Sequence, residues 1–315
     1  MIEYYAMNDE GVLEAVPHFQ KHSWVNVSSP SQDDIDYLIE ELHVPDDFMR
    51  YAVDRDESAR IEKDTDENIT LVIYDIPYYN NEDSEDSIYS TVPMSFIIEK
   101  DCIITISNDF QLLEQYQEAT LLKTLDPAIP TRFVLQFLYE AAKKYLAYLR
   151  ILNKRRKDIE KSIGTKPHNE DLMQLMRIER SLIYFIMSLK TNNLVLEKIR
   201  RGYYLVTYEE DNELLEDLMI ETQQGIEMAE ISNRIINEST DTYANLISNN
   251  MNEVMKFLTV YSLILSIPTI VFSFYGMNVH LPLADWKTMS WIIVTIIAII
   301  ISIAFIFYFK RKDYF

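Results

Sequence analysis

The chain falls into three stretches that differ in the pattern of hydrophobic and polar positions. Up to about residue 125, short β-rich runs alternate with short helical ones, which predicts an α/β fold. From Thr131 onward, apolar residues recur at three- and four-residue spacing, as they do in amphipathic helices. From Phe257 onward, two long runs are almost entirely apolar. We therefore expect residues 1–206 to form an α/β domain that includes a helical hairpin at about residues 131–204.

The hairpin is followed by a much longer helical segment. Its opening residues are acidic, which the positive N-terminal end of a helix dipole favours. From residue 207 to 274 the only glycine is Gly225 and the only proline is Pro268. We expect one continuous helix of about 90 to 100 Å, far longer than a bilayer requires. It is predicted to be a stalk that becomes the first membrane span at about residues 256–274.

Two apolar runs near the end of the chain predict a membrane hairpin. Residues 257–284 and 290–309 contain no charged side chain, and each run can cross roughly 30 Å of hydrocarbon. The second span is therefore placed at 290–309, after a short extracytoplasmic loop at 275–289. Lys256 precedes the first span and a basic tail, residues 310–315, follows the second, so both termini are expected in the cytoplasm. No signal-peptide pattern is found, which agrees with an integral protein of the plasma (inner) membrane.

The formal net charge of −21 is concentrated in the soluble part. Residues 257–315 contain four basic and two acidic residues, a net charge of +2, so residues 1–256 carry −23. Such a surface disfavours nucleic acid as a partner and can attract cations. The single cysteine excludes an internal disulfide, and the five histidines lack zinc-site spacing. No phosphate-binding glycine loop or nucleophile with a base is found, so an enzyme is not expected.

A polar stripe follows one face of the predicted stalk and first span. In the span, five hydroxyl residues are separated by steps of 3, 4, 3 and 4, which confines them to an arc of about 80°. The same spacing continues toward the N-terminus. The stripe consists of Asp241, Asn245, Ser248, Asn252, Met255, Thr259, Ser262, Ser266, Thr269 and Ser273.

The stripe is compatible with two different functions. Small hydroxyl residues mediate dry packing of membrane helices, so the stripe can belong to a membrane-anchored helical scaffold. Dry packing does not explain the amide side chains of Asn245 and Asn252 or the carboxylate of Asp241, which lie outside the membrane. A water-lined path does explain these polar groups. One hairpin cannot enclose a path, so several copies must surround it, with their first spans inside and the more aliphatic second spans outside.

The C-terminal third contains a recognisable order of motifs. Asn252-Glu253-Val254-Met255-Lys256 precedes the polar span, and Tyr275-Gly276-Met277-Asn278 follows it, before a short loop, a second span and a basic tail. In this order the chain resembles the CorA family of magnesium and other divalent-cation channels. The resemblance implies a homo-oligomer, expected to be a pentamer, in which the stalk helices form a funnel. It also implies Mg²⁺ influx, with Mg²⁺ as both transported and regulatory ion.

The resemblance further implies roles for single residues. Gly276, Met277 and Asn278 would form the outer mouth, Thr269 and Ser266 the middle, Leu258, Met255 and Asn252 the inner constriction, and Asp241 part of the funnel. Mg²⁺ releases its water reluctantly, so neutral amide and hydroxyl oxygens that bind the hydration shell can select the ion without trapping it.

A regulatory site is also implied by the resemblance. Acidic residues between neighbouring cytosolic domains would bind Mg²⁺ and close the channel when the ion is abundant. Asp217 corresponds to the stalk member of this site, and at 100° per residue it lies away from the frame of Asp241. Its partner is expected in the helix at residues 46–53, but Tyr51 occupies the position of the acid. Asp54 and Asp56 are the nearby substitutes.

Two alternatives remain open besides a magnesium channel. One is a Zn²⁺, Co²⁺ or Ni²⁺ transporter of the same family, although the stripe lacks the cysteine and clustered histidine that softer metals prefer. The other is the membrane-anchored scaffold described above.

Overall fold

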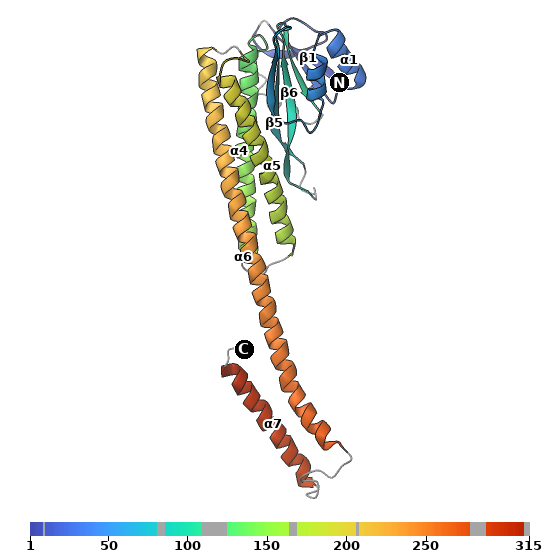
Figure 1. Cartoon of the computed structure of the whole chain (residues 1–315), viewed down its shortest axis with the longest axis vertical. Coiled ribbons are helices and arrows are strands. Elements are labelled where there is room, and N and C mark those ends of the chain that lie inside the picture. The colour runs from blue at the N-terminus through green and yellow to red at the C-terminus, as the bar shows by residue number, and fades with distance from the viewer. Residues whose placement is uncertain are drawn as a thin grey trace. The chain divides into compact units, whose positions relative to one another are not determined.

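The computed structural model describes residues 1–8, 10–80, 86–108, 125–163, 169–205, 208–277 and 288–311. The chain forms two compact units, unit 1 at Met1–Ser239 and unit 2 at Thr240–Phe315. The boundary falls within one long helix, α6 (Glu209–Tyr275), because the N-terminal half of this helix packs against the other helices of unit 1. The colour bar of Figure 1 locates each element along the chain.

Unit 1 is built on a seven-stranded sheet with the order β2-β1-β3-β7-β6-β5-β4. The strands are β1 (Ile2–Met7), β2 (Leu13–Val16), β3 (Ser23–Ser28), β4 (Arg60–Asp64), β5 (Ile69–Tyr79), β6 (Tyr89–Ile98) and β7 (Cys102–Ser107). Among the described strands, β3 and β7 pair in parallel and the other neighbours pair antiparallel. The sequence pattern did not predict β1 and β2, because most of their side chains are half-buried or exposed and show no clear alternation.

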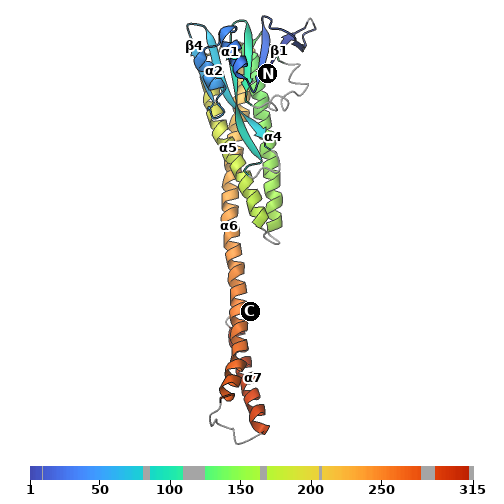
Figure 2. The same ribbon diagram turned by 90° about the vertical axis from the view of Figure 1, so that its right-hand side faces the viewer.

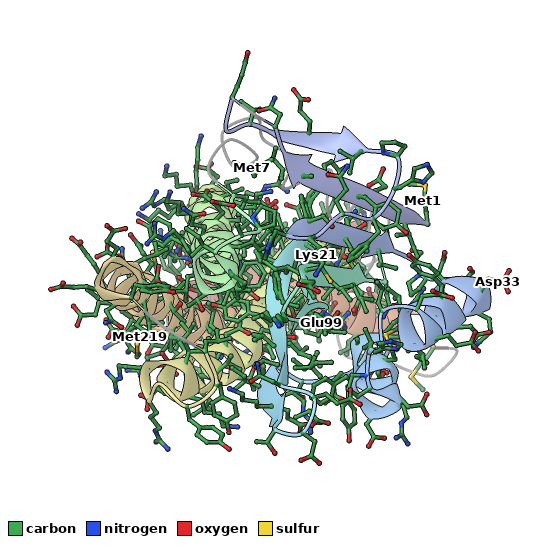
Figure 3. The ribbon with its side chains drawn as sticks, turned by 90° about the horizontal axis from the view of Figure 1, so that it is seen from above. Met1, Met7, Lys21, Asp33, Glu99 and Met219 are labelled. Atoms are coloured by element: carbon green, nitrogen blue, oxygen red, sulfur yellow. The ribbon has the colours of Figure 1, made fainter. Side chains whose placement is uncertain are left out.

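The sheet is covered on both faces, which makes unit 1 a three-layer structure. Along β5, Val72 and Tyr74 pack into the cluster with the long helices, whereas Leu71 and Ile73 pack into the cluster with α1 (Gln32–Glu40) and α2 (Asp46–Ala52). This alternation is what the two-residue period of a strand demands. Seen from above, the strands lie between Asp33 on α1 and Met219 on α6 (Figure 3).

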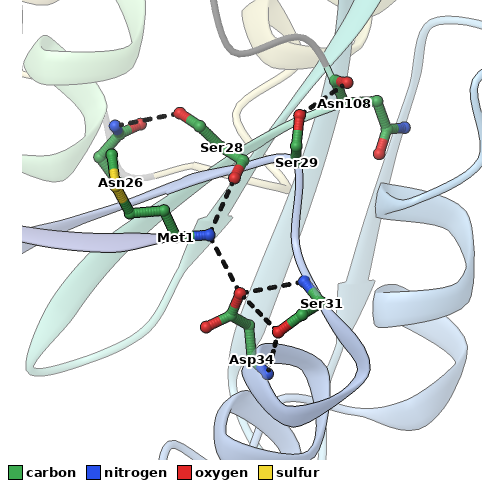
Figure 4. A network of polar contacts seen from close by, with 7 residues as sticks. All are labelled: Met1, Asn26, Ser28, Ser29, Ser31, Asp34 and Asn108. Atoms are coloured by element: carbon green, nitrogen blue, oxygen red, sulfur yellow. Dashed lines mark hydrogen bonds and ion pairs between the residues drawn. The ribbon is translucent and has the colours of Figure 1, made fainter.

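The start of α1 is fixed by a small polar network (Figure 4). Ser31 is the N-cap, and its hydroxyl and the Asp34 carboxylate form a capping box. The amino group of Met1 contacts Asp34 Oδ2 and the carbonyl oxygen of Ser28, both at 3.0 Å. Because Ser31 caps the helix, α1 begins at Gln32.

Three long helices, α4 (Pro130–Ile163), α5 (Asn169–Arg200) and the first part of α6, lie side by side in unit 1 (Figures 1 and 2). The sequence predicted that the second of them extends to Tyr204, but it ends at Arg200. Gly202 adopts a left-handed conformation with φ of 74°, and its N–H donates to the carbonyl oxygen of Ile199 at 2.9 Å. Such a glycine is a common helix terminator because it has no Cβ to oppose positive φ.

α4 and α6 run in the same direction with a constant register. Three side-chain hydrogen bonds join the two helices, and in each the partners are 79 residues apart. They are Arg132 to Asp211, Ser232 to Asn153, and Ser239 to Glu160, with the first-named residue as the donor. Gly225 meets Leu146 at the same separation. Along α4 these contacts lie at residues 132, 146, 153 and 160, which are multiples of seven residues apart. The two helices therefore form a parallel pair with heptad spacing.

Unit 2 contains the remainder of α6 and α7 (Thr288–Arg311). Within the described residues, these two helices are long and apolar enough to cross a membrane. The predicted loop at residues 275–289 and the end of the basic tail lie mostly outside the described residues.

Candidate functional site: the exposed face of α6

In unit 2, α7 packs against one side of α6. Val260 on α6 is only 1% exposed, and Val294 and Ala298 on α7 are buried as well. Ile264, Ile267 and other α6 residues at three- and four-residue spacing are partly covered. The contact is apolar, and its regular spacing identifies the face of α6 that α7 occupies.

The five hydroxyl residues lie on the opposite face of α6. At 100° per residue, their mean direction differs from that of the α7-contacting residues by about 170°. All of them, and the five stripe residues that precede them, are exposed in the single chain. Leu258 is exposed too, with 49% of its surface accessible. Only Thr269 also borders α7, because it lines a groove together with Thr295 and Ala298 of that helix. The rest of the described stripe faces away from the second span.

The hydroxyl groups are oriented by the helix itself. Thr259 donates to the carbonyl oxygen of Met255 at 2.7 Å, Ser266 to that of Ser262 at 2.8 Å, and Thr269 to that of Leu265 at 3.1 Å. Since each O–H group donates inward, the lone pairs of its oxygen remain as acceptors on the exposed face. Acceptors suit a hydrated cation, whose water molecules present their hydrogens.

The predicted outer mouth is only partly described. Gly276 and Met277 directly follow the last residue of α6 and are exposed. The N–H of Gly276 donates to the carbonyl oxygen of Phe272 at 2.9 Å, which closes the last turn. Asn278 lies outside the described residues.

The exposed positions that continue the polar stripe extend beyond Asp241, the N-terminal residue of the stripe that the sequence predicted. In unit 1 the steps of 3 and 4 continue, and every position on them is exposed. We call the positions nearest to Asp241 the α6 seam: Glu227, Ile231, Arg234 and Glu238. Further back the same steps reach Asp217, which at about 100° per residue has turned roughly 120° away from Asp241. The seam residues could have been recognised in the sequence, because they continue the steps of 3 and 4 before Asp241. They are harder to recognise than the polar stripe, because apolar, acidic and basic residues are mixed among them.

The predicted regulatory acids are exposed and belong to separate elements. Asp217 lies on α6, and Asp54 and Asp56 follow α2. The N–H of Asp56 donates to Asp54 Oδ1 at 3.0 Å. In the described part of the chain, no group of three or more His, Cys, Asp or Glu side chains is arranged to hold a metal ion.

Tyr51, at the position where the resemblance leads us to expect an acid, contacts a cation of its own chain. The guanidinium carbon of Arg60 lies 4.3 Å from the centre of the Tyr51 ring. Arg60 also forms ion pairs with Glu57, at 3.2 Å, and with Glu62. The position is thus part of a cation–π contact and an ion-pair network, not a carboxylate site.

Comparison with known proteins gives a consistent result. The chain matches the family model described as CorA-like Mg²⁺ transporter protein over residues 19–311. The cobalt/magnesium transport protein CorA of Methanocaldococcus jannaschii is 26% identical over 297 residues, which cover 92% of this chain and 90% of the relative. A CorA protein of the same description from Thermotoga maritima is 25% identical over 157 residues, 50% of this chain and 44% of the relative.

Solved structures show the same fold. The complete structure of the CorA magnesium transporter from Methanocaldococcus jannaschii aligns with a TM-score of 0.82 at 23% identity, covering 100% of this chain and 99% of that chain. The full-length CmaX protein aligns with a TM-score of 0.71 at 13% identity, covering 96% and 97%. The common fold comprises a soluble α/β domain, a long helix and a C-terminal apolar helix.

Proposed function

Because the chain belongs to the CorA-like Mg²⁺ transporter family, we propose that it is a divalent-cation channel of the plasma (inner) membrane that conducts Mg²⁺ into the cytoplasm. The observation that carries this proposal is the exposed stripe of α6, which lies opposite the face covered by α7. The proposed topology has two spans, at about residues 256–274 and 290–309, with both termini in the cytoplasm. Transport, not catalysis, is the activity of this family.

Several copies form the pore, and we expect five. A single stripe in the membrane is open on its outer side, so only a ring of copies can enclose a water-filled path. With α7 behind each α6, the copies place their stripes inward and the aliphatic α7 helices toward lipid. The steps of 3 and 4 along the stripe suit helices that meet in a parallel, left-handed bundle.

The stripe acts on the hydration shell of Mg²⁺. The ion holds its water strongly, so a path lined with neutral acceptor oxygens can pass the hydrated ion. Ser262, Ser266 and Thr269 accept hydrogen bonds from the ion's water molecules, and Asn278 does so at the outer mouth. Because none of these groups is charged, each binds the ion weakly enough to release it.

The inner end of the span contains the gate. Met255 and Leu258 are apolar and exposed, with 56% and 49% of their surfaces accessible. Rings of such residues exclude water when the pore is narrow, and a dewetted segment stops ion flow. Asn252 and Asp241 lie on the cytosolic side of this constriction.

Cytosolic Mg²⁺ closes the channel through Asp217 of one copy and Asp54 or Asp56 of its neighbour. The three carboxylates are exposed, so binding of the ion between copies neutralises them and holds the copies together. Because Tyr51 contacts Arg60 and has no carboxylate, we assign the neighbour's part of the site to Asp54 and Asp56. Asp217→Ala should therefore weaken the inhibition of flux by Mg²⁺ inside the vesicles.

Mg²⁺ influx into liposomes that contain the purified protein tests the pore. Thr269→Val should reduce influx, whereas Thr295→Val should not. The two threonines are matched, because each donates to a carbonyl oxygen four residues earlier, at 3.1 and 2.8 Å, but only Thr269 lies on the stripe. Asn278→Ala should abolish most of the influx. Equal effects of the two valine variants would refute the assignment of the stripe.

Cobalt is the second candidate substrate, because the relative from Methanocaldococcus jannaschii is named a cobalt/magnesium transport protein. The oxygen groups of the stripe favour the harder Mg²⁺, and the stripe has neither the cysteine nor the histidine that Co²⁺, Ni²⁺ or Zn²⁺ prefer. Competition by each of these ions in the same influx assay measures the order of preference.

A membrane-anchored scaffold predicts a dry stripe, which labelling can test. Cys102, the only native cysteine, is 2% exposed, so a cysteine placed at Ser262 or Ser266 is the only accessible thiol in each variant. Labelling of both positions by a membrane-impermeant reagent supports a water-filled path. Protection of both would favour the scaffold.

A further inference from the structure

Arg234 is the exceptional residue of the α6 seam. Between residues 209 and 255, α6 contains twelve acidic residues and one basic residue, which is Arg234. It is exposed, and it lies one heptad after Glu227 and one heptad before Asp241. Glu238, which also belongs to the seam, follows Arg234 by one turn, so a single basic side chain stands among three acidic positions on the face that continues the polar stripe.

Arg234 does not belong to the ion pairs that join the described helices of unit 1. Other cations of unit 1 join helices: Arg132 binds Asp211 at 3.0 Å, and Lys190 of α5 binds Glu230 at 2.5 Å. Arg234 forms no hydrogen bond or ion pair with the residues that the structure describes. Glu230, one turn before it on α6, is already bound by Lys190. The stability of the single chain does not explain an arginine here.

We propose that the Arg234 side chains of neighbouring copies form a ring of positive charge in the cytosolic part of the ion path and limit the flux of divalent cations. This inference rests on the proposed function, because the ring exists only if the α6 seams surround the path. The acidic rings at Glu227 on one side, and at Glu238 and Asp241 on the other, attract a divalent cation, and the arginine ring forms an electrostatic barrier between them.

The size of the barrier follows from charge and screening. Each copy contributes one guanidinium charge to the ring. Each charge acts over a screening length of about 8 Å at physiological ionic strength, so the ring affects ions in the path and not ions in bulk solution. Several positive charges repel each doubly charged ion in the path. Removal of the ring should therefore raise Mg²⁺ influx roughly three-fold or more.

Reversal of the charge by chemical modification provides the test. Arg234→Cys introduces a thiol into a chain whose one native cysteine is buried. Mg²⁺ influx is measured in liposomes before and after reaction with a positively charged and with a negatively charged methanethiosulfonate reagent. We expect the unmodified variant to exceed the wild type roughly three-fold, the cationic adduct to return toward the wild type, and the anionic adduct to exceed the unmodified variant.

The matched control is Lys198→Cys, an exposed basic residue of α5 that lies outside the seam. Its influx should not depend on the sign of the reagent. Arg234→Lys, which keeps the charge and is tolerated at an exposed site, should behave as the wild type and confirms that folding is intact. If influx through Arg234→Cys is unaffected by the sign of the adduct, the ring is refuted. If the wild type itself shows no influx that Asn278→Ala abolishes, the proposed function fails instead.

Discussion

Asn192 of α5 holds the main chain of Asp75 in β5 by two hydrogen bonds. Its Nδ2 donates to the Asp75 carbonyl oxygen at 2.7 Å, and its Oδ1 accepts from the Asp75 N–H at 2.9 Å. β4 pairs with β5 only as far as Arg60, which lies opposite Ile73. Asp75, two residues further along β5, therefore has no partner in β4. The amide of a helix thus replaces the missing strand partner, which fixes α5 on the sheet.

Asn192→Ala should destabilise the protein by about 2 to 4 kcal/mol, because the Asp75 N–H loses its partner in a buried site. The carbonyl oxygen of Asp75 keeps a hydrogen bond from Tyr145 at 3.0 Å, which limits the loss. Thermal unfolding of the purified protein measures the change. Asn193→Ala, at the next and less buried position, should have a much smaller effect. Equal losses in the two variants would contradict this role of Asn192.

The carboxyl group of Asp75 predicts a pH dependence. Burial raises its pKa from 3.8 to about 6, although hydrogen bonds from Ser188 and Thr191 act in the opposite direction. The folded state therefore binds the proton more tightly than the unfolded state, and the resulting stability is fully present below pH 3.8 and is lost as the pH rises through about 6. Asp75→Asn removes this loss, so it should stabilise the protein by about 2 kcal/mol at pH 7.5.

The difference in unfolding temperature between Asp75→Asn and the wild type should shrink as the pH falls from 7.5 to 4.5. A difference that is constant over this range would mean that the Asp75 carboxyl is already protonated, or does not titrate, near pH 6. A phosphate-free buffer series at constant ionic strength separates this effect from screening of the acidic surface.

Gly225 allows α4 and α5 to approach α6. A Cβ atom at this position would lie 3.2 Å from Leu189 Cδ1 and 3.9 Å from Leu146 Cδ2. An alanine displaces only the tip of Leu189, and it gains helix propensity, so Gly225→Ala should change stability by less than about 1 kcal/mol. Gly225→Val should destabilise by about 1 to 3 kcal/mol, because two further methyl groups enter a packed site.

The control for the glycine variants is Gln223→Val on the exposed side of the same helix turn. Thermal unfolding of the three variants should rank Gly225→Val as the least stable. If Gly225→Val unfolded at the temperature of the control, the close approach of the three helices would not depend on this glycine.

Two acids bind Arg132, and they should differ in importance. Asp211 is fully buried, bonds Arg132 Nε at 3.0 Å and accepts the N–H of Tyr208 at 2.9 Å, whereas Glu210 is 80% exposed. Asp211→Ala removes an ion pair and a helix cap, so it should cost about 2 to 4 kcal/mol. Glu210→Ala should cost less than about 1 kcal/mol, as exposed pairs do. Unfolding in urea measures both, and a larger loss for Glu210→Ala would reverse this assignment.

Periodic features could be predicted from the sequence, because a period is a local property. The resemblance to the CorA family is confirmed, and so are the soluble α/β domain, the long helix and the apolar C-terminal helix. The hydroxyl steps of α6 already defined a face, and the structure adds that α7 occupies the opposite one.

Features that depend on distant segments could not be predicted in this way. β1 and β2 form an edge of the sheet without strong alternation, and nothing near Asn192 in the sequence indicates that it bonds Asp75. Arg234 was accessible to periodic reasoning but was missed, because one basic residue among acids looks like ordinary surface. The pairing of such residues is decided by tertiary packing, which single-sequence patterns do not contain.

The constant offset of 79 residues between α4 and α6 restricts how unit 1 can transmit a signal. A slide of α6 along α4 by part of a heptad would separate Arg132 from Asp211 and Glu160 from Ser239 at once. The next equivalent alignment is a full heptad away, about 10 Å along the axis. Sliding of α6 along the axis of α4 is therefore costly. A conformational change that starts in the sheet would instead tilt or rotate α4 and α6 together as a rigid pair.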